Sequence, residues 1–151
     1  MKKLLLILSI LVASVPTFAK DLPILPDPTI TPGEVLETAT VDKICMTGYT
    51  KKVRNVSQST KNRVFRLYDI DRYSDKFEID HLISLELGGS NSIQNLWPQS
   101  YTLRPWNAYK KDALENRMHR LICRGELDLS IAQKEIAQNW IDAYKKYVGN
   151  K

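Results

Sequence analysis

The stretch FEIDHLISLELGGSNSIQNLW, residues 77–97, decides the fold expected for this chain. Apolar and acidic residues alternate between Lys76 and His81, which is the period of two that a half-buried strand shows. A loop with two adjacent glycines follows, and Leu96-Trp97 then forms a second short strand that Pro98 closes. The stretch therefore predicts a small antiparallel two-stranded sheet.

Helices are expected on both sides of these strands. Ser57 or Ser59 can cap a helix before them. Pro105 suits the first turn of a helix after them, and Ser130 with Gln133 can form a capping box for a last helix. Together the pattern predicts an α+β fold. The remaining expected elements are a short strand at 40–45 and helices at about 58–68, 105–124 and 130–148.

The first 19 residues have the layout of a secretory signal peptide. Met1-Lys2-Lys3 is basic, Leu4 to Val15 is almost entirely apolar, and Thr17-Phe18-Ala19 resembles a cleavage site. The apolar run is shorter than the roughly 20 residues that a membrane-spanning helix needs, although a membrane anchor is the alternative. The sequence thus predicts an exported protein, periplasmic or secreted, cut after Ala19.

The mature chain is expected to hold one domain. Residues 20–39 carry four prolines and predict an extended lead-in, and residues 40–150 are long enough for one core. Without Lys2 and Lys3, the 22 basic residues fall to 20 against 17 acidic ones, a net charge of +3. That charge permits binding to a polyanion without requiring it.

Two cysteines, Cys45 and Cys123, lie in the exported part. An even count in an oxidising compartment predicts one disulfide. It would tie the N-terminal region to a late helix and stabilise the fold by roughly 3–5 kcal/mol in the chain-entropy model. Two free buried thiols are the alternative, and two cysteines without a CxxC argue against a structural zinc site.

The polar residues near the predicted strands suit the hydrolysis of a phosphodiester. That reaction needs an activated water and a cation that offsets charge on the phosphate. Asp80 and Asn107 carry oxygen donors of the kind that a hard ion such as magnesium prefers, and the strand–loop–strand–helix order folds the chain back so that they can meet. The imidazole of His81 is a suitable base at physiological pH.

Three further residues have expected roles in such a site. A histidine base needs a partner on its second ring nitrogen, and Asn95 could supply it or could instead brace the loop. Lys110 and Lys111, one turn beyond Asn107, could contact the backbone phosphate of a substrate.

Ile79-Asp80-His81, the Gly-Gly loop, Asn95-Leu96 and Asn107 with Lys110 resemble the Asp-His … Asn … Asn form of the HNH nuclease motif. The resemblance covers about residues 77–111 and implies a ββα-metal finger around one divalent ion, Mg²⁺ or Mn²⁺ with Zn²⁺ or Ni²⁺ as alternatives. The flanking segments resemble small exported bacterial HNH-like proteins. Ser84 stands where many members have proline, and no paired zinc-binding cysteines surround the finger. The roles implied are Asp80 and Asn107 as metal ligands, His81 as general base and Asn95 as its orienter.

Each of these residues also has a structural interpretation that the sequence leaves open. His119 lies about 18 Å along the same helix from Asn107 and is expected to be structural. Glu86 is expected in a salt bridge, and Asp112 is expected to face elsewhere on the helix. The structural alternatives are a buried histidine for His81, a strand-end ion pair for Asp80, a turn residue for Asn95 and a helix N-cap for Asn107.

The function expected is that of a monomeric, metal-dependent endonuclease acting on DNA, with RNA as an alternative. Recognition through phosphates would make it largely sequence-nonspecific and salt-sensitive. The first rival is a non-catalytic polyanion-binding or structural module with a degenerate finger. The second is a cell-wall hydrolase using Glu78 and Glu86. An immunity protein would suit a toxin-like nuclease, but no residue indicates one. A basic track or, equally, a solvated face is expected from Lys51, Lys52, Arg54, Lys61, Arg63 and Arg66.

Overall fold

The structure is a computed structural model that describes residues 22–149. The predicted signal peptide, residues 1–19, lies outside the described residues. The fold is α+β with one antiparallel two-stranded sheet, as predicted. The elements in chain order are α1 (Val41–Ile44), α2 (Tyr49–Val53), α3 (Gln58–Leu67), β1 (Phe77–His81), the 3₁₀ turns η1 (Leu85–Leu87) and η2 (Ile93–Asn95), β2 (Leu96–Ser100), α4 (Ala108–Cys123) and α5 (Leu129–Tyr147).

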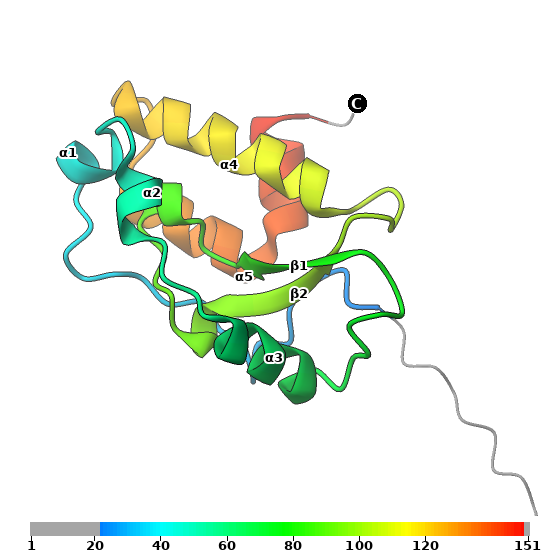
Figure 1. Ribbon diagram of the computed structural model, residues 1–151. Helices are drawn as coiled ribbons and strands as arrows, with labels where there is room; N and C mark the ends of the chain where they lie inside the picture. The colour runs from blue at the N-terminus through cyan, green and yellow to red at the C-terminus, as the bar shows by residue number, and fades with distance from the viewer. Residues whose placement is uncertain (1–21, 150–151) are drawn as a thin grey trace, which may run out of the picture.

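The β1–β2 hairpin lies between α3 and the packed pair α4 and α5 (Figure 1). Its register places Asp80 opposite Trp97 and His81 opposite Leu96. The second strand continues through Pro98, where the sequence predicted its end. In a two-stranded sheet each strand has a free edge, so the missing N–H of a proline costs no ladder hydrogen bond when it faces outward.

The short strand predicted at residues 40–45 is wrong, because this segment forms the helical turn α1. The N–H of Ile44 donates to the Thr40 carbonyl. This turn buries Ile44 in the core and leaves Val41 and the charged residues beside it exposed. A strand here would need a ladder partner, and the described part of the chain holds only the β1–β2 sheet and one isolated bridge.

Side-chain caps set the helix starts. Ser57 caps α3 as predicted, accepting from the N–H of Thr60. α4 begins later than predicted, at Ala108, because the Asn107 side chain caps it. α5 is capped by Asp128 and not by Ser130, since a carboxylate is the stronger acceptor for the free N–H groups of the first turn. None of the described helices combines the length and apolar character needed to span a bilayer.

The proline-rich residues 22–39 lie across the domain and form only one isolated bridge, between Val35 and Gly89. The Thr31 hydroxyl donates to the carbonyl of Leu96 at 2.8 Å. The Trp140 indole donates to the carbonyl of Ile24 at 3.1 Å. Long-range hydrogen bonds to β2 and α5 therefore hold this segment.

The predicted disulfide between Cys45 and Cys123 is confirmed, and the alternative of two free thiols is wrong. The bond joins the end of α1 to the end of α4 across 78 residues of sequence. It therefore fastens the N-terminal helical turns to the C-terminal helix pair.

The Gly88-Gly89 loop supports a first prediction. A Cβ on Gly89 would lie 1.7 Å from the carbonyl oxygen of Ile83. Because this oxygen belongs to the backbone, relieving the clash would require the main chain to move. We expect Gly89→Ala to lower the free energy of unfolding by about 3 kcal/mol, the upper end of overpacking costs, as measured by urea denaturation. The matched control is Gly125→Ala, whose Cβ meets nothing within 4 Å. Its positive φ should cost only about 1 kcal/mol. Equal losses would contradict the prediction.

Candidate functional site

The end of β1 and the start of α4 meet at a buried ammonium group. Lys111 is 1% exposed. Its Nζ lies 2.7 Å from Asp80 Oδ2, donates to the His81 carbonyl at 2.7 Å and forms an ion pair with Glu115. Burial alone would lower the pKa of Lys111, but the Asp80 and Glu115 carboxylates outweigh it and hold this pKa above its ordinary value. A charged lysine therefore links the strand to the helix.

The expectation that Lys111 contacts a substrate phosphate is wrong for this structure, because its ammonium group is enclosed and fully engaged. The neighbouring Lys110 points to the other side of the helix. Its Nζ donates to the Tyr144 hydroxyl at 3.1 Å and lies 5.2 Å from the centre of that ring. Successive helix residues point about 100° apart, which separates the two lysines.

Two more carboxylates, those of Glu78 and Asp112, interact electrostatically with Asp80. Glu78 shares its face of β1, and Asp112 follows Lys111 on α4. Burial and then the Asp80 charge raise the pKa of Glu78, and the same two causes raise the pKa of Asp112. The exposed position of Asp112 on α4 is consistent with the expectation that it faces elsewhere on the helix. The sequence reasoning missed that α4 crosses the end of β1 closely enough for Lys111 to reach Asp80.

These carboxylates have spare acceptor capacity. The Tyr101 hydroxyl donates to Glu78 Oε2 at 2.6 Å, whereas Oε1 of Glu78 is buried without a hydrogen-bond partner. Asp80 contacts Lys111 through Oδ2. Lys111 pairs with Asp80 and Glu115, whereas burial and the Asp80 charge raise the pKa of Glu78 and of Asp112. These two directions indicate an environment that favours additional positive charge.

His81 is held by an asparagine that the sequence reasoning did not select. The ring is 3% exposed, and its Nε2 lies 3.1 Å from Asn91 Oδ1. The orientation of Asn91 is fixed, because its Nδ2 donates to the Val53 carbonyl and its Oδ1 accepts from the N–H of Asn55. Since Oδ1 can only accept, Nε2 of His81 carries the hydrogen and Nδ1 carries the lone pair.

The charge state of His81 follows from its surroundings. Burial lowers the pKa of the His81 imidazole below its ordinary value of 6.5, and the hydrogen bond to Asn91 offsets only part of that effect. The ring is therefore neutral at neutral pH. A neutral imidazole with a free lone pair is the form that can accept a proton.

Asn95 braces the loop and does not orient the imidazole, which corrects its predicted catalytic role. It is fully buried, accepts from the N–H of Ile83 at 2.9 Å, and donates to the carbonyls of Ile83 and Ser90 at 2.9 Å each. These bonds close the loop that carries Asn91. The useful sequence signal was the Gly-Gly-Ser-Asn run, which ends ten residues after His81.

Asn107 serves as a helix cap, one of the two interpretations that the sequence left open. Its Oδ1 accepts from the N–H of Lys110 at 3.2 Å, and its Nδ2 donates to the Leu103 carbonyl at 3.0 Å. Both ends of the carboxamide are engaged within the loop before α4. The predicted pairing of Asp80 with Asn107 around one ion is therefore not the arrangement in this structure.

The donor chemistry nevertheless fits a hard cation at a different set of residues. The unpartnered Glu78 Oε1 is an oxygen donor on the same strand face as Asp80. Among the described residues, the only three Cys, His, Asp or Glu side chains with ligand atoms within 4.8 Å of one another are Cys45, His119 and Cys123. The acidic site thus offers one or two carboxylates, which is the usual protein share of a magnesium site completed by water and phosphate.

Glu86 and His119 lie together, apart from His81. Glu86 Oε2 is 3.8 Å from His119 Nδ1, a contact that becomes an ion pair when the ring is protonated. The other ring nitrogen of His119 lies 3.0 Å from the Ile44 carbonyl oxygen. Contacts to η1 and α1 therefore give His119 the structural surroundings that the sequence predicted.

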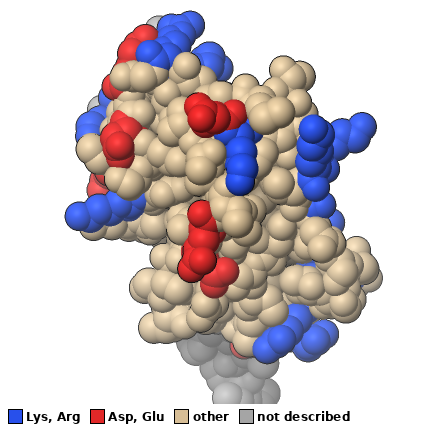
Figure 2. All heavy atoms as spheres, turned by 90° about the vertical axis from the view of Figure 1, so that its left-hand side faces the viewer, with Lys and Arg blue, Asp and Glu red and all other residues tan. Residues whose placement is uncertain are grey.

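The surface gives little support for a continuous basic track. Figure 2 shows the face that carries α1 and α2, where acidic groups lie between separate basic ones. Lys51, Lys52 and Arg54 are exposed, which is consistent with a solvated face. A hollow of about 690 Å³ runs along the end of α3 and is lined by none of the motif residues. Binding to nucleic acid would therefore depend on local groups around the site.

Comparison with known proteins provides no relative from which a function could be transferred. No family model, curated protein or solved structure matches this chain.

Proposed function

We propose that this chain is an exported HNH-type endonuclease that hydrolyses phosphodiester bonds of DNA, and of RNA as a second substrate, without marked sequence preference. The observation that carries the proposal is the state of His81. Its imidazole is neutral, and its hydrogen is fixed on Nε2 by Asn91. It directly follows Asp80 at the end of β1. This combination supports a general base beside a phosphate-activating group.

In the proposed reaction, Nδ1 of His81 accepts a proton from the attacking water. The ring then becomes an imidazolium, which the Asp80 charge stabilises, while Nε2 keeps its hydrogen bond to Asn91. Lys111 holds both the Asp80 carboxylate and the His81 carbonyl, so it positions the end of the strand. A hard cation bound by Asp80 and Glu78 would supply the Lewis acid that offsets charge on the phosphate and the leaving oxygen.

Export is part of the proposal. The N-terminal pattern supports a signal peptide, and the Cys45–Cys123 disulfide supports an oxidising compartment. No described helix is suited to cross a membrane. The proposed enzyme therefore works in the periplasm or outside the cell.

A non-catalytic exported module is the second candidate, and one observation favours it. Lys111 already neutralises Asp80 from within the fold, and His81 is 3% exposed. An internally paired Asp80 and a buried His81 are also expected in a finger whose polar residues only stabilise the fold. The two candidates differ in whether the protein turns over substrate.

The test is nicking of supercoiled plasmid by the mature protein in Mg²⁺ or Mn²⁺, with and without a chelator. We expect metal-dependent nicking, and a loss of about 100-fold in Asp80→Asn, typical of removing one electrostatic group from a site. Asp142→Asn is the matched control, since Asp142 is an exposed aspartate paired with Lys145, and it should nick like the wild type. No nicking by folded wild type with either metal would leave the non-catalytic module as the better account.

A further inference from the structure

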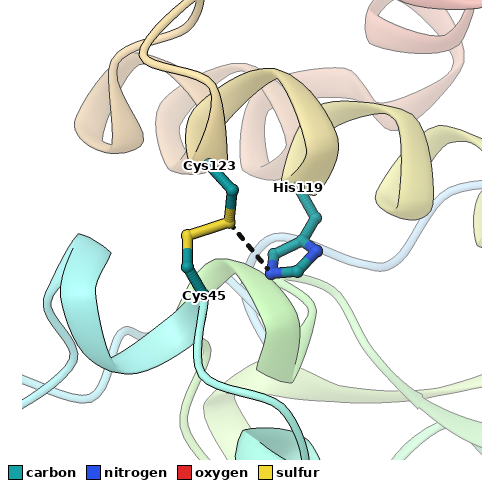
Figure 3. Close-up of side chains that lie close together, drawn as sticks. All are labelled: Cys45, His119 and Cys123. Atoms are coloured by element: carbon teal, nitrogen blue, oxygen red, sulfur yellow. Dashed lines mark hydrogen bonds between the residues drawn. A yellow bond between two sulfur atoms is a disulfide. The ribbon is translucent and has the colours of Figure 1, made fainter.

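A second cluster of chemistry-bearing side chains lies where α1 and α4 meet. Cys45, His119 and Cys123 converge there, with the imidazole directed at the sulfur of Cys123 (Figure 3). Nε2 of His119 is 3.4 Å from Cys123 Sγ, and all three ligand atoms lie within 4.8 Å of one another. Zinc bonds of about 2.3 Å to sulfur and 2.1 Å to nitrogen separate tetrahedral ligand atoms by roughly 3.5–3.8 Å. The nitrogen–sulfur distance is therefore close to that of a zinc site, and the two bonded sulfur atoms would have to move apart once the disulfide is reduced.

The residue before each cysteine is anchored in the core. Ile44 precedes Cys45 and Ile122 precedes Cys123, and both isoleucines are 2% exposed in the core. His119 also contacts α1, because its Nε2 lies 3.0 Å from the Ile44 carbonyl oxygen, within hydrogen-bond distance. Burial on both sides of the cluster therefore limits how far the sulfur atoms can separate.

We propose that reduction of the Cys45–Cys123 disulfide converts this cluster into a binding site for Zn²⁺, with two thiolates and the His119 imidazole as ligands. Two sulfurs and one nitrogen suit a borderline-soft ion such as zinc and do not suit magnesium. The site is separate from Asp80 and His81, and the proposal does not depend on nuclease activity.

The chemistry balances with a dithiol as the reductant. The Cys45–Cys123 S–S bond breaks and takes two electrons and two protons, while the dithiol is oxidised to its own disulfide. Zinc then displaces the two thiol protons, so binding releases them to solvent. The disulfide form has no thiolate to offer. The redox state of one bond therefore decides whether the metal binds.

The surroundings of His119 support a role as a ligand. In the disulfide form its Nε2 faces the Ile44 carbonyl, and in the zinc form Nε2 would give its lone pair to the metal. The hydrogen then sits on Nδ1, which is 3.8 Å from Glu86 Oε2, an arrangement that orients many metal-bound imidazoles. A hollow of about 230 Å³ bordered by Cys45, Gly48, Glu86 and His119 offers room for a water molecule as the fourth ligand.

The experiment titrates Co²⁺, as a spectroscopic probe for the zinc site, into full mature protein in its oxidised and reduced forms, followed by Zn²⁺ competition. Reduced wild type should show a thiolate-to-cobalt charge-transfer band at one ion per chain and bind Zn²⁺ at least 100-fold more tightly than oxidised wild type. His119→Ala keeps both thiols, and its reduced form should bind Zn²⁺ at least tenfold more weakly than the reduced wild type. Arg120→Ala, an exposed neighbour on α4, is the control and should bind like the wild type.

Two outcomes would overturn the proposal. Binding of Zn²⁺ by the reduced wild type no more tightly than by the oxidised form would show that the sulfurs do not form a site. Binding of Zn²⁺ by reduced His119→Ala as tightly as by the wild type would show that the imidazole is not a ligand. Circular dichroism of the reduced protein with and without metal separates loss of the fold from loss of a ligand. Refolding driven by Zn²⁺ in wild type but not in His119→Ala would support the proposal.

Discussion

Replacing Lys111 with methionine should lower the free energy of unfolding by about 3–5 kcal/mol, the cost of breaking a buried ion pair on one side. The change removes the only buried ammonium group near Asp80 and Glu115 among the described residues. Methionine has a similar length but cannot donate, so the two carboxylates and the His81 carbonyl lose their shared donor. Urea denaturation at neutral pH measures the effect.

The loss of unfolding free energy caused by Lys111→Met should become smaller as the pH falls. Burial raises the pKa of Glu115, so acid neutralises this carboxyl early, and an uncharged carboxyl needs no ammonium partner. The matched control is Lys145→Met, which removes an exposed lysine paired with Asp142 at 2.9 Å. Exposed pairs contribute at most about 1 kcal/mol. A loss in Lys111→Met no larger than that of the control would contradict the role given to this lysine.

His81→Ala should reduce the rate of plasmid nicking by about 10²–10⁴-fold, the usual contribution of a general base. The variant deletes the lone pair on Nδ1 but leaves Asp80 and Lys111 in place. Tyr73→Ala removes another ring from an exposed position, 81% accessible, and should keep the wild-type rate. A His81→Ala rate within a few-fold of wild type, in a protein that still melts cooperatively, would exclude His81 as the base.

The sign of the pH dependence follows from the lowered pKa of His81. The base form persists as the pH falls through 6.5, the ordinary histidine value, and is lost only below the lowered pKa. Between these two values the unfolded chain takes up a proton that the folded chain does not, so stability also falls there. His81→Ala lacks this contribution and should show a smaller acid-induced loss over the same range.

The hairpin and its helices could be predicted because their signals are local. The alternation before His81 defines β1, and Ser57 supplies a cap of the expected kind. The short helix at residues 41–44 could not be separated from a strand, because four residues carry too little periodicity. The burial of Ile44 against distant parts of the chain favours the helix over the strand at these residues.

The sequence predicted that Asp80 and His81 lie together, but it did not predict which groups contact them. Asp80 and His81 stand together at the end of β1, as their adjacency required. Asn91 replaces Asn95 as the partner of the imidazole, because the loop folds back upon its own glycines and buries Asn95. The sequence predicts an accessible Lys111, because sequence alone does not show that the first turn of α4 packs against the end of β1.

The central claim, that His81 is a neutral base with its lone pair on Nδ1, is tested most directly by the ¹⁵N chemical shifts of its imidazole across a pH titration. At neutral pH they should show hydrogen on Nε2 and none on Nδ1, with protonation of the ring only below the ordinary histidine range. A ring that carries its hydrogen on Nδ1, or that is already an imidazolium at neutral pH, would contradict the account.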